Sequence, residues 1–289
     1  MSQSIRTAVF PVAGRGTRFL PATKATPKEM LPIVDKPLIQ HAVEEAVAAG
    51  ATHMVFVTGS TKKAIEDHFT ADAALEDALA GSGKEDLLRS IRDIVPNGVS
   101  FTYVLQEEPL GLGHAVLCAR EAVGDEPFFV HLCDDLIAGV APCLCQMMDE
   151  YGRHGGSIIA VETVPPEDTS RYGIVAIDGE SQRISQIVEK PAPEDAPSSL
   201  AVVGRYLLIP QIFDKLAMTE RGAGGEIQLT DAIADMLEEF PVFAYAFSGE
   251  RYDCGDKLGY LKATVAYGLE HDETGKPFRE HLRDIIDKH

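Results

Sequence analysis

Apolar residues in the first half of the chain form short continuous runs separated by segments of helical spacing. The runs predict strands over 7–12, 54–57, 101–105 and 128–132. The segments between them carry apolar residues every three or four positions and predict helices over 38–47, over 65–94 with an interruption at 81–83, and over 115–122. Strands that alternate with helices are typical of βαβ units around a parallel sheet, so the pattern predicts an α/β fold.

The second half of the chain has a different pattern, in which β-rich runs lack long helices between them. The predicted strands cover 158–164, 174–177, 184–188 and 202–209. We expect these strands to form a second sheet region. Helical spacing then returns over 212–218, 227–237 and 258–269. The proline-rich segment 191–197 is predicted to be an exposed loop between strands.

The net charge of the chain is strongly negative. Its 289 residues contain 26 Lys and Arg against 45 Asp and Glu, which gives −19 at pH 7. Such a charge repels phosphate backbones and anionic membranes, so we expect neither nucleic acid nor a membrane as a partner. No apolar run reaches the roughly 20 residues of a membrane span, no signal-peptide core follows Met1, and the cysteines lack paired spacing. We therefore expect a cytoplasmic protein with reduced cysteines.

The start of the chain reverses this charge. No carboxylate precedes Glu29, whereas basic side chains occur at Arg6, Arg15, Arg18, Lys24 and Lys28. The segment Gly14-Arg15-Gly16-Thr17-Arg18 follows a predicted strand directly, where backbone N–H groups can point at phosphates. Its spacing fits neither a Walker loop nor the dinucleotide fingerprint, which needs a glycine where this chain has Phe19. The segment therefore predicts an anion-binding loop of another kind, with a basic surface turn as the alternative.

Further short motifs follow this loop along the chain. They are Pro27 to Pro32, Gln106 to Val116, Asp134-Asp135, Tyr172-Gly173, Val188 to Pro191, Gly225 to Asp231 and Asp253-Cys254-Gly255. Together with Gly14 to Arg18, and in this order, they resemble the sugar-nucleotide pyrophosphorylases over nearly the whole chain. The long helical insert before Gln106 and the sequence Gly-Leu-Gly-His-Ala-Val resemble the uridylyl branch of that family. One departure is Cys133, where the family usually has a small residue.

This resemblance implies a Rossmann-like fold, with a mixed, mainly parallel sheet flanked by helices and an additional β-rich sugar-binding region. It implies one nucleotidyltransferase domain over 1–289. Within that domain we expect a nucleotide-binding part over 1–156, a β-rich sugar-binding part over 157–255 and a C-terminal helical segment over 256–289. The resemblance also implies a homo-oligomer, either a dimer or a tetramer.

The reaction that the resemblance implies is Mg²⁺-dependent transfer of a uridylyl group from UTP to glucose 1-phosphate, which yields UDP-glucose and pyrophosphate. The attacking phosphate has a second pKa of about 6, by analogy with phosphorylated side chains, so it is already an oxyanion at neutral pH. Catalysis then needs positioning and charge neutralisation rather than a general base.

Cations and carboxylates in the motifs suit this chemistry. Arg18 is expected to bind the triphosphate, because a guanidinium matches phosphate oxygens bidentately, and Lys28 is expected to assist it. Asp134 follows a predicted strand, at the edge where parallel sheets present ligands, and Asp253 precedes a glycine turn. We expect these two carboxylates to hold Mg²⁺, with helix capping as the alternative role of Asp134 or of Asp135.

Further residues are expected to bind the nucleotide base and the sugar. By resemblance, the nucleotide is bound by Ala13, Gly14, Gly16, Glu29, Gln106 and Gly111. Gln106 carries a donor and an acceptor on one amide, as a uracil-binding residue needs. By resemblance, Glu189 accepts sugar hydroxyls, the catalytic Lys190 pairs with the sugar phosphate, and the backbone of Gly173 approaches the hexose.

Two points of geometry go with these expectations. Glu189 and Lys190 can face the same side only if their strand has ended, which Pro191 favours. His114 has no proton to move in this reaction and is interpreted as a capping or core histidine.

Two alternatives stay open at this point. A non-catalytic homologue could bind nucleotide sugars as a regulator, but it would be free to lose the residues that are all present here: Arg18, Lys28, Asp134 and Lys190. A sibling enzyme that uses dTTP differs in one methyl group of the base, which an apolar pocket distinguishes by only about 1–3 kcal/mol.

Overall fold

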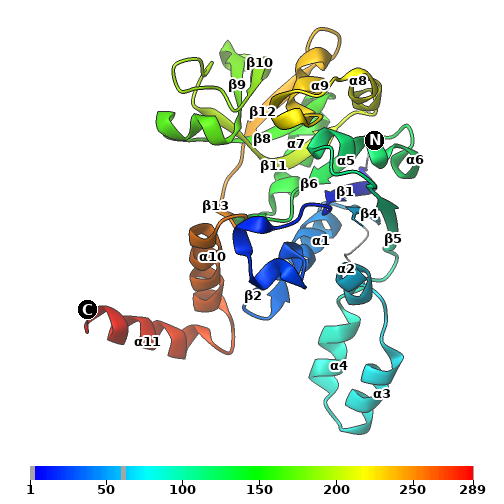
Figure 1. Cartoon of the computed structure of the whole chain (residues 1–289). Helices are drawn as coiled ribbons and strands as arrows, with labels where there is room; N and C mark the ends of the chain where they lie inside the picture. Colours follow the sequence, from blue (N-terminus) through cyan, green and yellow to red (C-terminus); the bar gives the residue numbers. More distant parts are fainter. Residues whose placement is uncertain (1–3, 60–62, 289) are drawn as a thin grey trace.

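One mixed sheet of nine strands organises the chain, in the order β5-β4-β1-β6-β11-β8-β12-β10-β9 (Figure 1). The computed structural model describes residues 4–59 and 63–288. Within them, β10 and β11 run opposite to the other strands of this sheet. The sheet is therefore mixed and mainly parallel, as the sequence predicts.

The predicted strands of the first half form the parallel part of the sheet. They are β1 Thr7–Pro11, β4 His53–Thr58, β5 Ser100–Leu105 and β6 Phe128–His131. β1 pairs with β4 on one side and with β6 on the other, and β4 pairs with β5, in parallel each time. This part of the prediction is confirmed.

The strands of the β-rich second half belong to the same sheet, so the prediction of a second sheet region is wrong. Its strands are β8 Ser157–Thr163, β9 Gly173–Asp178, β10 Arg183–Glu189, β11 Leu200–Leu208 and β12 Val242–Ala246, of which β12 has no counterpart in the prediction. β11 joins the two halves, because it pairs antiparallel with β6, with Arg205 opposite His131. Apolar periodicity reports the type of an element but not the strand beside which it pairs.

Alternating side chains of the central strands enter two apolar cores on opposite faces of the sheet. Val9 of β1 packs on one face, whereas Ala8 and Phe10 pack on the other. The first face is covered by α5 Leu112–Cys118, α6 Arg120–Val123, α8 Ile212–Met218 and α9 Leu229–Met236. The second face is covered by α1 Leu38–Ala48 and by α7 Cys143–His154, a helix that the sequence pattern missed. Helices on both faces explain why β1 is continuously apolar.

A buried ion cluster links the second helical layer to the sheet. Arg205 of β11 is fully buried and donates from Nε to Oε1 and from Nη2 to Oε2 of Glu45 in α1, at 3.0 and 2.8 Å. His131 of β6 lies 3.2 Å from the same Oε2, and the backbone N–H of Leu144 in α7 donates to Oε1. The cluster fixes α1 and α7 against β6, the strand that leads to the predicted metal carboxylate Asp134.

The long insert before Gln106 forms a helical projection at one edge of the sheet (Figure 1). The helix predicted over 65–94 consists of α2 Lys63–His68, α3 Ala73–Gly81 and α4 Glu85–Arg92. The break near Gly83, where φ is 70°, was expected. A second break was missed; it lies before Asp72, whose side chain caps α3 by accepting from the N–H of Leu75 at 3.0 Å.

Two small sheets and several short 3-10 helices lie between the main elements. In the first sheet, β2 Pro32–Ile33 pairs with β3 Lys36–Pro37, and in the second, β7 Asp135–Ala138 pairs antiparallel with β13 Glu250–Asp253. The short helices are η1 Thr17–Phe19, η2 Ala22–Lys24, η3 Lys28–Met30, η4 Pro166–Arg171, η5 Gly179–Ser181 and η6 Ala223–Gly225. The pairing of β7 with β13 brings the predicted metal residues Asp134 and Asp253 to one end of the main sheet.

The chain ends in a helical arm that stands off the main body (Figure 1). It consists of α10 Lys257–Glu270, which packs beside β13 and β2, and α11 Gly275–Ile286. Both helices expose large apolar side chains, at Leu258, Leu261 and Val265 of α10 and at Ile285 and Ile286 of α11. Among the described residues, no helix has both the length and the apolar character that crossing a membrane requires.

Candidate functional site

Two cavities lie beside the loop that follows β1. The carboxylate cavity, about 510 Å³, has walls that include Arg18, Asp134, Gly173, Glu189, Lys190 and Asp253. The loop cavity, about 570 Å³, has walls that include Ala13, Gly14, Arg15, Thr17, Pro27 and Gln106. Most of the predicted site residues therefore come together at the carboxyl ends of β1 and β6, where open α/β sheets bind ligands. The exceptions are Gly16, Lys28, Glu29 and Gly111, which line neither cavity.

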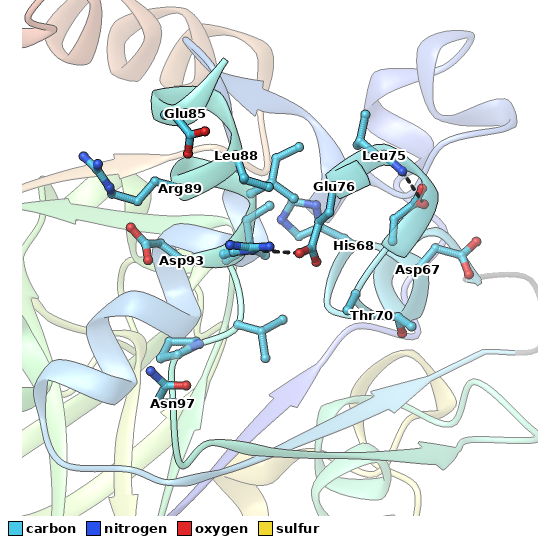
Figure 2. Close-up of a pocket in the computed structure, with 17 residues that line it drawn as sticks. Asp67, His68, Thr70, Leu75, Glu76, Glu85, Leu88, Arg89, Asp93 and Asn97 are labelled. Atoms are coloured by element: carbon cyan, nitrogen blue, oxygen red, sulfur yellow. Dashed lines mark hydrogen bonds and ion pairs between the residues drawn. The ribbon is translucent and has the colours of Figure 1, made fainter. Parts of the chain in front are cut away.

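A larger cavity, about 980 Å³, lies among the helices of the projection (Figure 2). None of the predicted site residues line it. Its wall carries charges of both signs, which include Glu76 of α3, labelled in Figure 2. Glu76 pairs with Arg92 of α4 at 2.7 Å. We assign no function to this cavity, because its paired charges leave no set of groups that converges on a ligand.

The two glycines of the predicted anion-binding loop, Gly14 and Gly16, have different surroundings. Gly16 has φ of 61°, and a Cβ there would lie 3.0 Å from Cβ of Lys28, so a side chain would collide with η3. Gly14 has open space where its side chain would be, which leaves its backbone accessible from the loop cavity. A hydrogen bond from Thr23 Oγ1 to the carbonyl of Gly16, at 2.7 Å, holds the backbone of Gly16 in place.

Asp134, Asp253 and Arg18 converge on one point beside Gly255. A Cβ on Gly255 would lie 2.9 Å from Asp134 Oδ2, 2.9 Å from Asp253 Oδ1 and 3.3 Å from Arg18 Nη2. The convergence follows from the pairing of β7 with β13, which places Asp253 opposite Asp135, and from the N–H of Cys254, which donates to the carbonyl of Asp134 at 2.7 Å. The sequence predicted the two carboxylates but missed the role of Gly255, where a side chain would collide with both of them.

This arrangement fits a hard divalent cation. Within the described residues, no group of three or more His, Cys, Asp and Glu side chains could enclose a metal ion. Mg²⁺ is commonly held by one or two carboxylates and takes its remaining oxygens from water and phosphates. Asp134 Oδ2 and Asp253 Oδ1 lie on the same side of Gly255, which suits an ion that arrives with a phosphate ligand. In this structure the first oxygen pairs with Lys28 and the second accepts from the N–H of Gly255 at 2.9 Å.

Lys28 neutralises Asp134 in this structure. Its Nζ forms an ion pair with Asp134 Oδ2. Burial by itself lowers the pKa of Lys28, but the Asp134 carboxylate and then Glu29 raise it above its ordinary range. Burial likewise favours a raised pKa for Asp134, which the Lys28 ammonium more than offsets, so the pKa of Asp134 lies below its usual value. Both groups are therefore charged, and Glu29, which is buried in η3, contributes negative charge behind them.

Two arginines that the sequence did not single out complete the carboxylate cavity. Arg171 of η4 places Nη2 3.5 Å from Asp253 Oδ2 and 3.5 Å from Asp256 Oδ2. Arg251 of β13 pairs with both Asp135 and Glu162, and its guanidinium lies 5.2 Å from the centre of the Tyr172 ring. No motif in the sequence contained either arginine.

Asp135 has a structural role beside the predicted metal carboxylate. Its Oδ2 accepts from the backbone N–H of Gly204 in β11 at 2.8 Å, and its Oδ1 pairs with Arg251. Both oxygens are thus used to fasten β7 to β11 and β13. Cys133, the departure from the family pattern, is buried in the apolar core on the other side of Asp134, and this burial raises its thiol pKa well above the ordinary value.

Glu189 and Lys190 both face the carboxylate cavity, as expected if the strand ends there. β10 ends at Glu189, and Lys190 turns out of the strand with φ of 45° while its N–H donates to the carbonyl of Tyr172 at 2.9 Å. Lys190 Nζ lies 2.8 Å from Glu189 Oε1, and Glu189 Oε2 accepts from Thr230 Oγ1 at 2.9 Å. A Cβ on Gly173 would lie 2.8 Å from Cγ2 of Thr230, so the packing of α9 requires this glycine.

Gln106 directly follows β5, and hydrogen bonds hold the amino end of its side-chain amide. Its Nε2 donates to the carbonyl of Gly111 at 3.2 Å and lies 2.9 Å from Nδ1 of His114. Gly111 has φ of 101°, and a Cβ there would lie 2.7 Å from Cβ of Glu226. The 226–227 segment therefore requires a glycine at position 111, and the expected contact of Gly111 with the nucleotide stays a prediction.

A glycine-rich basic loop, two converging carboxylates and several cations at the ends of a parallel sheet define a nucleotide-binding enzyme that handles phosphate groups. The nucleotidyl transferase family matches residues 8–269, and the chain belongs to this family.

Individual relatives cover the whole length of the chain. A UTP–glucose-1-phosphate uridylyltransferase of Bacillus subtilis is 50% identical over 99% of this chain and 99% of its own length. A UTP-bound UGPase from Acinetobacter baumannii has a TM-score of 0.89 and 44% identity, over 96% of this chain and 98% of that one. A UDP-glucose pyrophosphorylase complexed with UDP-glucose has a TM-score of 0.85 and 46% identity, over 92% of this chain and all of that one.

Proposed function

We propose that this protein transfers the uridylyl group of UTP to glucose 1-phosphate, forming UDP-glucose and pyrophosphate. The observation that carries the proposal is the convergence of Asp134 Oδ2, Asp253 Oδ1 and Arg18 Nη2 beside Gly255. The full-length relatives named for this reaction support the choice of substrates.

The reaction exchanges one phosphoanhydride bond for another. A phosphate oxygen of glucose 1-phosphate bonds to the α-phosphorus of UTP, and the bond from that phosphorus to the oxygen of the leaving pyrophosphate breaks. The nucleophile is already an oxyanion, so no residue has to remove a proton, and the residues must orient two anions that repel each other.

The two cavities suggest a division of the substrates. The loop cavity suits the nucleoside, because Ala13, Gly14 and Gln106 line it. The carboxylate cavity suits the sugar phosphate, since Glu189 can accept sugar hydroxyls and Lys190 can pair with the phosphate. Arg18 lies at the carboxylates, in position to stabilise the charge that develops at the α-phosphorus.

Mg²⁺ is the cofactor that we propose for Asp134 and Asp253, and when bound it supplies positive charge that neutralises phosphate oxygens. The chain's own contribution is to keep the carboxylates charged and the position between them open. Lys28 maintains the charge of Asp134 until Mg²⁺ and triphosphate arrive, and it is then placed to pair with phosphate oxygens.

Other parts of the proposal rest on separate observations. Free cysteines suit a cytoplasmic location, because a reducing compartment keeps thiols unpaired. The exposed apolar residues Leu258, Leu261 and Ile286 of the C-terminal arm support a homo-oligomer, since a second copy would cover them. The division of one domain into nucleotide-binding, sugar-binding and C-terminal parts at residues 156 and 255 stays a prediction.

Pyrophosphate release tests the proposal. UTP, dTTP, ATP and CTP are each combined with several sugar 1-phosphates, with Mg²⁺ and with excess chelator. We expect the highest kcat/KM for UTP with glucose 1-phosphate and no turnover in chelator. Preference for dTTP would instead identify the sibling thymidylyl activity, and tight UDP-glucose binding without turnover would identify a regulatory homologue.

A further inference from the structure

The Gln106 amide can be oriented from its partners alone. A side-chain amide has an acceptor end and a donor end of nearly the same shape, so its hydrogen-bond partners determine which end is which. The carbonyl of Gly111 can only accept, which makes the atom 3.2 Å from it the amino nitrogen Nε2. The other end, Oε1, accepts no hydrogen bond from the described residues, and Gln106 lines the loop cavity.

His114 binds the second hydrogen of the same amino group. Its Nδ1 lies 2.9 Å from Gln106 Nε2, and because Nε2 can only donate, Nδ1 must be the unprotonated acceptor. The imidazole proton is therefore on Nε2, which lies 3.8 Å from the sulfur of Cys118. With both of its hydrogens used, the amino group of Gln106 has none to offer a ligand.

Backbone hydrogen bonds hold in place the segment that carries Gly111 and His114. Gly111 precedes α5, and His114 lies in the first turn of that helix. The N–H of Gly113 donates to the carbonyl of Ile227 at 2.9 Å, and the N–H of Ile227 donates to the carbonyl of Leu110 at 2.7 Å. Both partners of the Gln106 amino group are thus fastened to the 226–228 segment.

We propose that His114 is a positioning residue for nucleotide specificity, which holds Gln106 so that its carbonyl oxygen faces the base. Uracil presents an N–H donor at N3 to this oxygen, whereas cytosine presents a lone pair at N3. This orientation of Gln106 favours UTP over CTP, because in the CTP complex the Gln106 carbonyl oxygen and cytosine N3, both acceptors, would face each other. It does not select UTP over dTTP, since thymine has the same N3–H.

The inference rests on the proposed function, because it assumes that the loop cavity holds the base. It also replaces the interpretation of His114 as a capping or core histidine with a role in positioning Gln106. The role requires an acceptor at Nδ1, which separates it from a purely packing role.

Calorimetric titration of the full chain with UTP and with CTP, each with Mg²⁺, tests the proposal. His114→Leu removes the acceptor, whereas His114→Asn can place an amide oxygen where Nδ1 stood. Cys118→Ala is the matched control, because it changes another neighbour of the imidazole, whose sulfur lies 3.8 Å from Nε2 and 4.0 Å from Nδ1, and leaves the contact of His114 with Gln106. We expect the ratio of Kd for CTP to Kd for UTP to fall about fivefold in His114→Leu and to stay close to that of the wild type in the other two variants.

A second measurement is made on the wild type and needs a variant only to assign the His114 signals. Long-range ¹H–¹⁵N spectra of the wild type, with His114 assigned by its absence in His114→Asn, report which ring nitrogen carries the proton. We expect the proton on Nε2. A proton on Nδ1 would overturn the proposal, and so would equal weakening of UTP and CTP binding in His114→Leu. A wild type that binds CTP as tightly as UTP would contradict the proposed uridylyl activity, whereas the spectra would still report the tautomer.

Discussion

Lys28 and Asp134 form an ion pair between a cation expected to bind phosphate and a carboxylate expected to bind metal. In the proposed reaction each group would exchange the other for a new partner, Asp134 for Mg²⁺ and Lys28 for the triphosphate. The site also avoids an unpaired buried charge before the substrates arrive.

We expect Asp134→Asn to lower kcat at least 100-fold and to destabilise the protein. The first effect follows from loss of a metal ligand, and the second from leaving Lys28 without its partner, which costs about 1–3 kcal/mol because the pair is only partly exposed. Thermal unfolding and steady-state kinetics measure the two effects. The double variant Lys28→Met with Asp134→Asn should be more stable than Asp134→Asn alone; equal stability would show that the Lys28 charge is not buried enough to matter.

Gly255→Ala should abolish activity without unfolding the protein. The added Cβ would lie 2.9 Å from an oxygen of each metal carboxylate, so both would have to move apart. We expect at least a 100-fold loss in kcat and weaker Mg²⁺ binding in calorimetry. Gly81→Ala is the control, since nothing lies within 4 Å of its added Cβ, and it should behave as the wild type. Normal Mg²⁺ affinity in Gly255→Ala would place the metal elsewhere.

Lys190→Ala should reduce kcat/KM for glucose 1-phosphate at least about tenfold, because it removes one charge-assisted contact worth about 1.5–3 kcal/mol. The Kd for UTP should hardly change, since Lys190 lines the carboxylate cavity and not the loop cavity. Lys190→Arg should restore only part of the loss, because a planar guanidinium does not replace a compact ammonium. Loss of UTP affinity with an unchanged dependence on glucose 1-phosphate would show that the division of the two cavities is incorrect.

Stability should fall as pH decreases from about 6.5 towards 4. Burial and then the Arg205 guanidinium lower the pKa of His131 to about 4, against a partly offsetting effect of Glu45. Between these two pH values His131 is protonated in the unfolded chain but not in the folded chain. A fall in pH across this range therefore lowers the free energy of unfolding by up to about 3 kcal/mol. Urea unfolding at a series of pH values measures this slope. In His131→Gln the slope should be smaller, and an unchanged slope would assign it to other groups.

Much of the candidate site could be predicted because its motifs are local in sequence. The loop from Gly14 to Arg18 and the segment from Gln106 to Val116 each combine backbone geometry and side-chain chemistry within a few residues. Helical and strand periodicity also predicted the parallel half of the sheet, since each element there has its own apolar face.

The remaining features depend on pairing between distant segments. Arg171 reaches Asp253 from another part of the chain, and Arg251 acts through Asp135 only because β13 pairs with β7. The continuity of the sheet depends on β11 lying beside β6. Residue types and spacing do not report such contacts, so neither the two arginines nor the extent of the sheet could be predicted.

The left-handed backbone of Lys190 implies a conflict between stability and activity at this position. A residue with a side chain loses about 1–2 kcal/mol in that conformation, whereas glycine adopts it readily. Lys190→Gly should therefore be nearly as stable as the wild type or more stable, although its kcat/KM for glucose 1-phosphate should fall at least about tenfold, as in Lys190→Ala. A search for stabilised variants would favour this substitution, and only selection for turnover would retain the lysine.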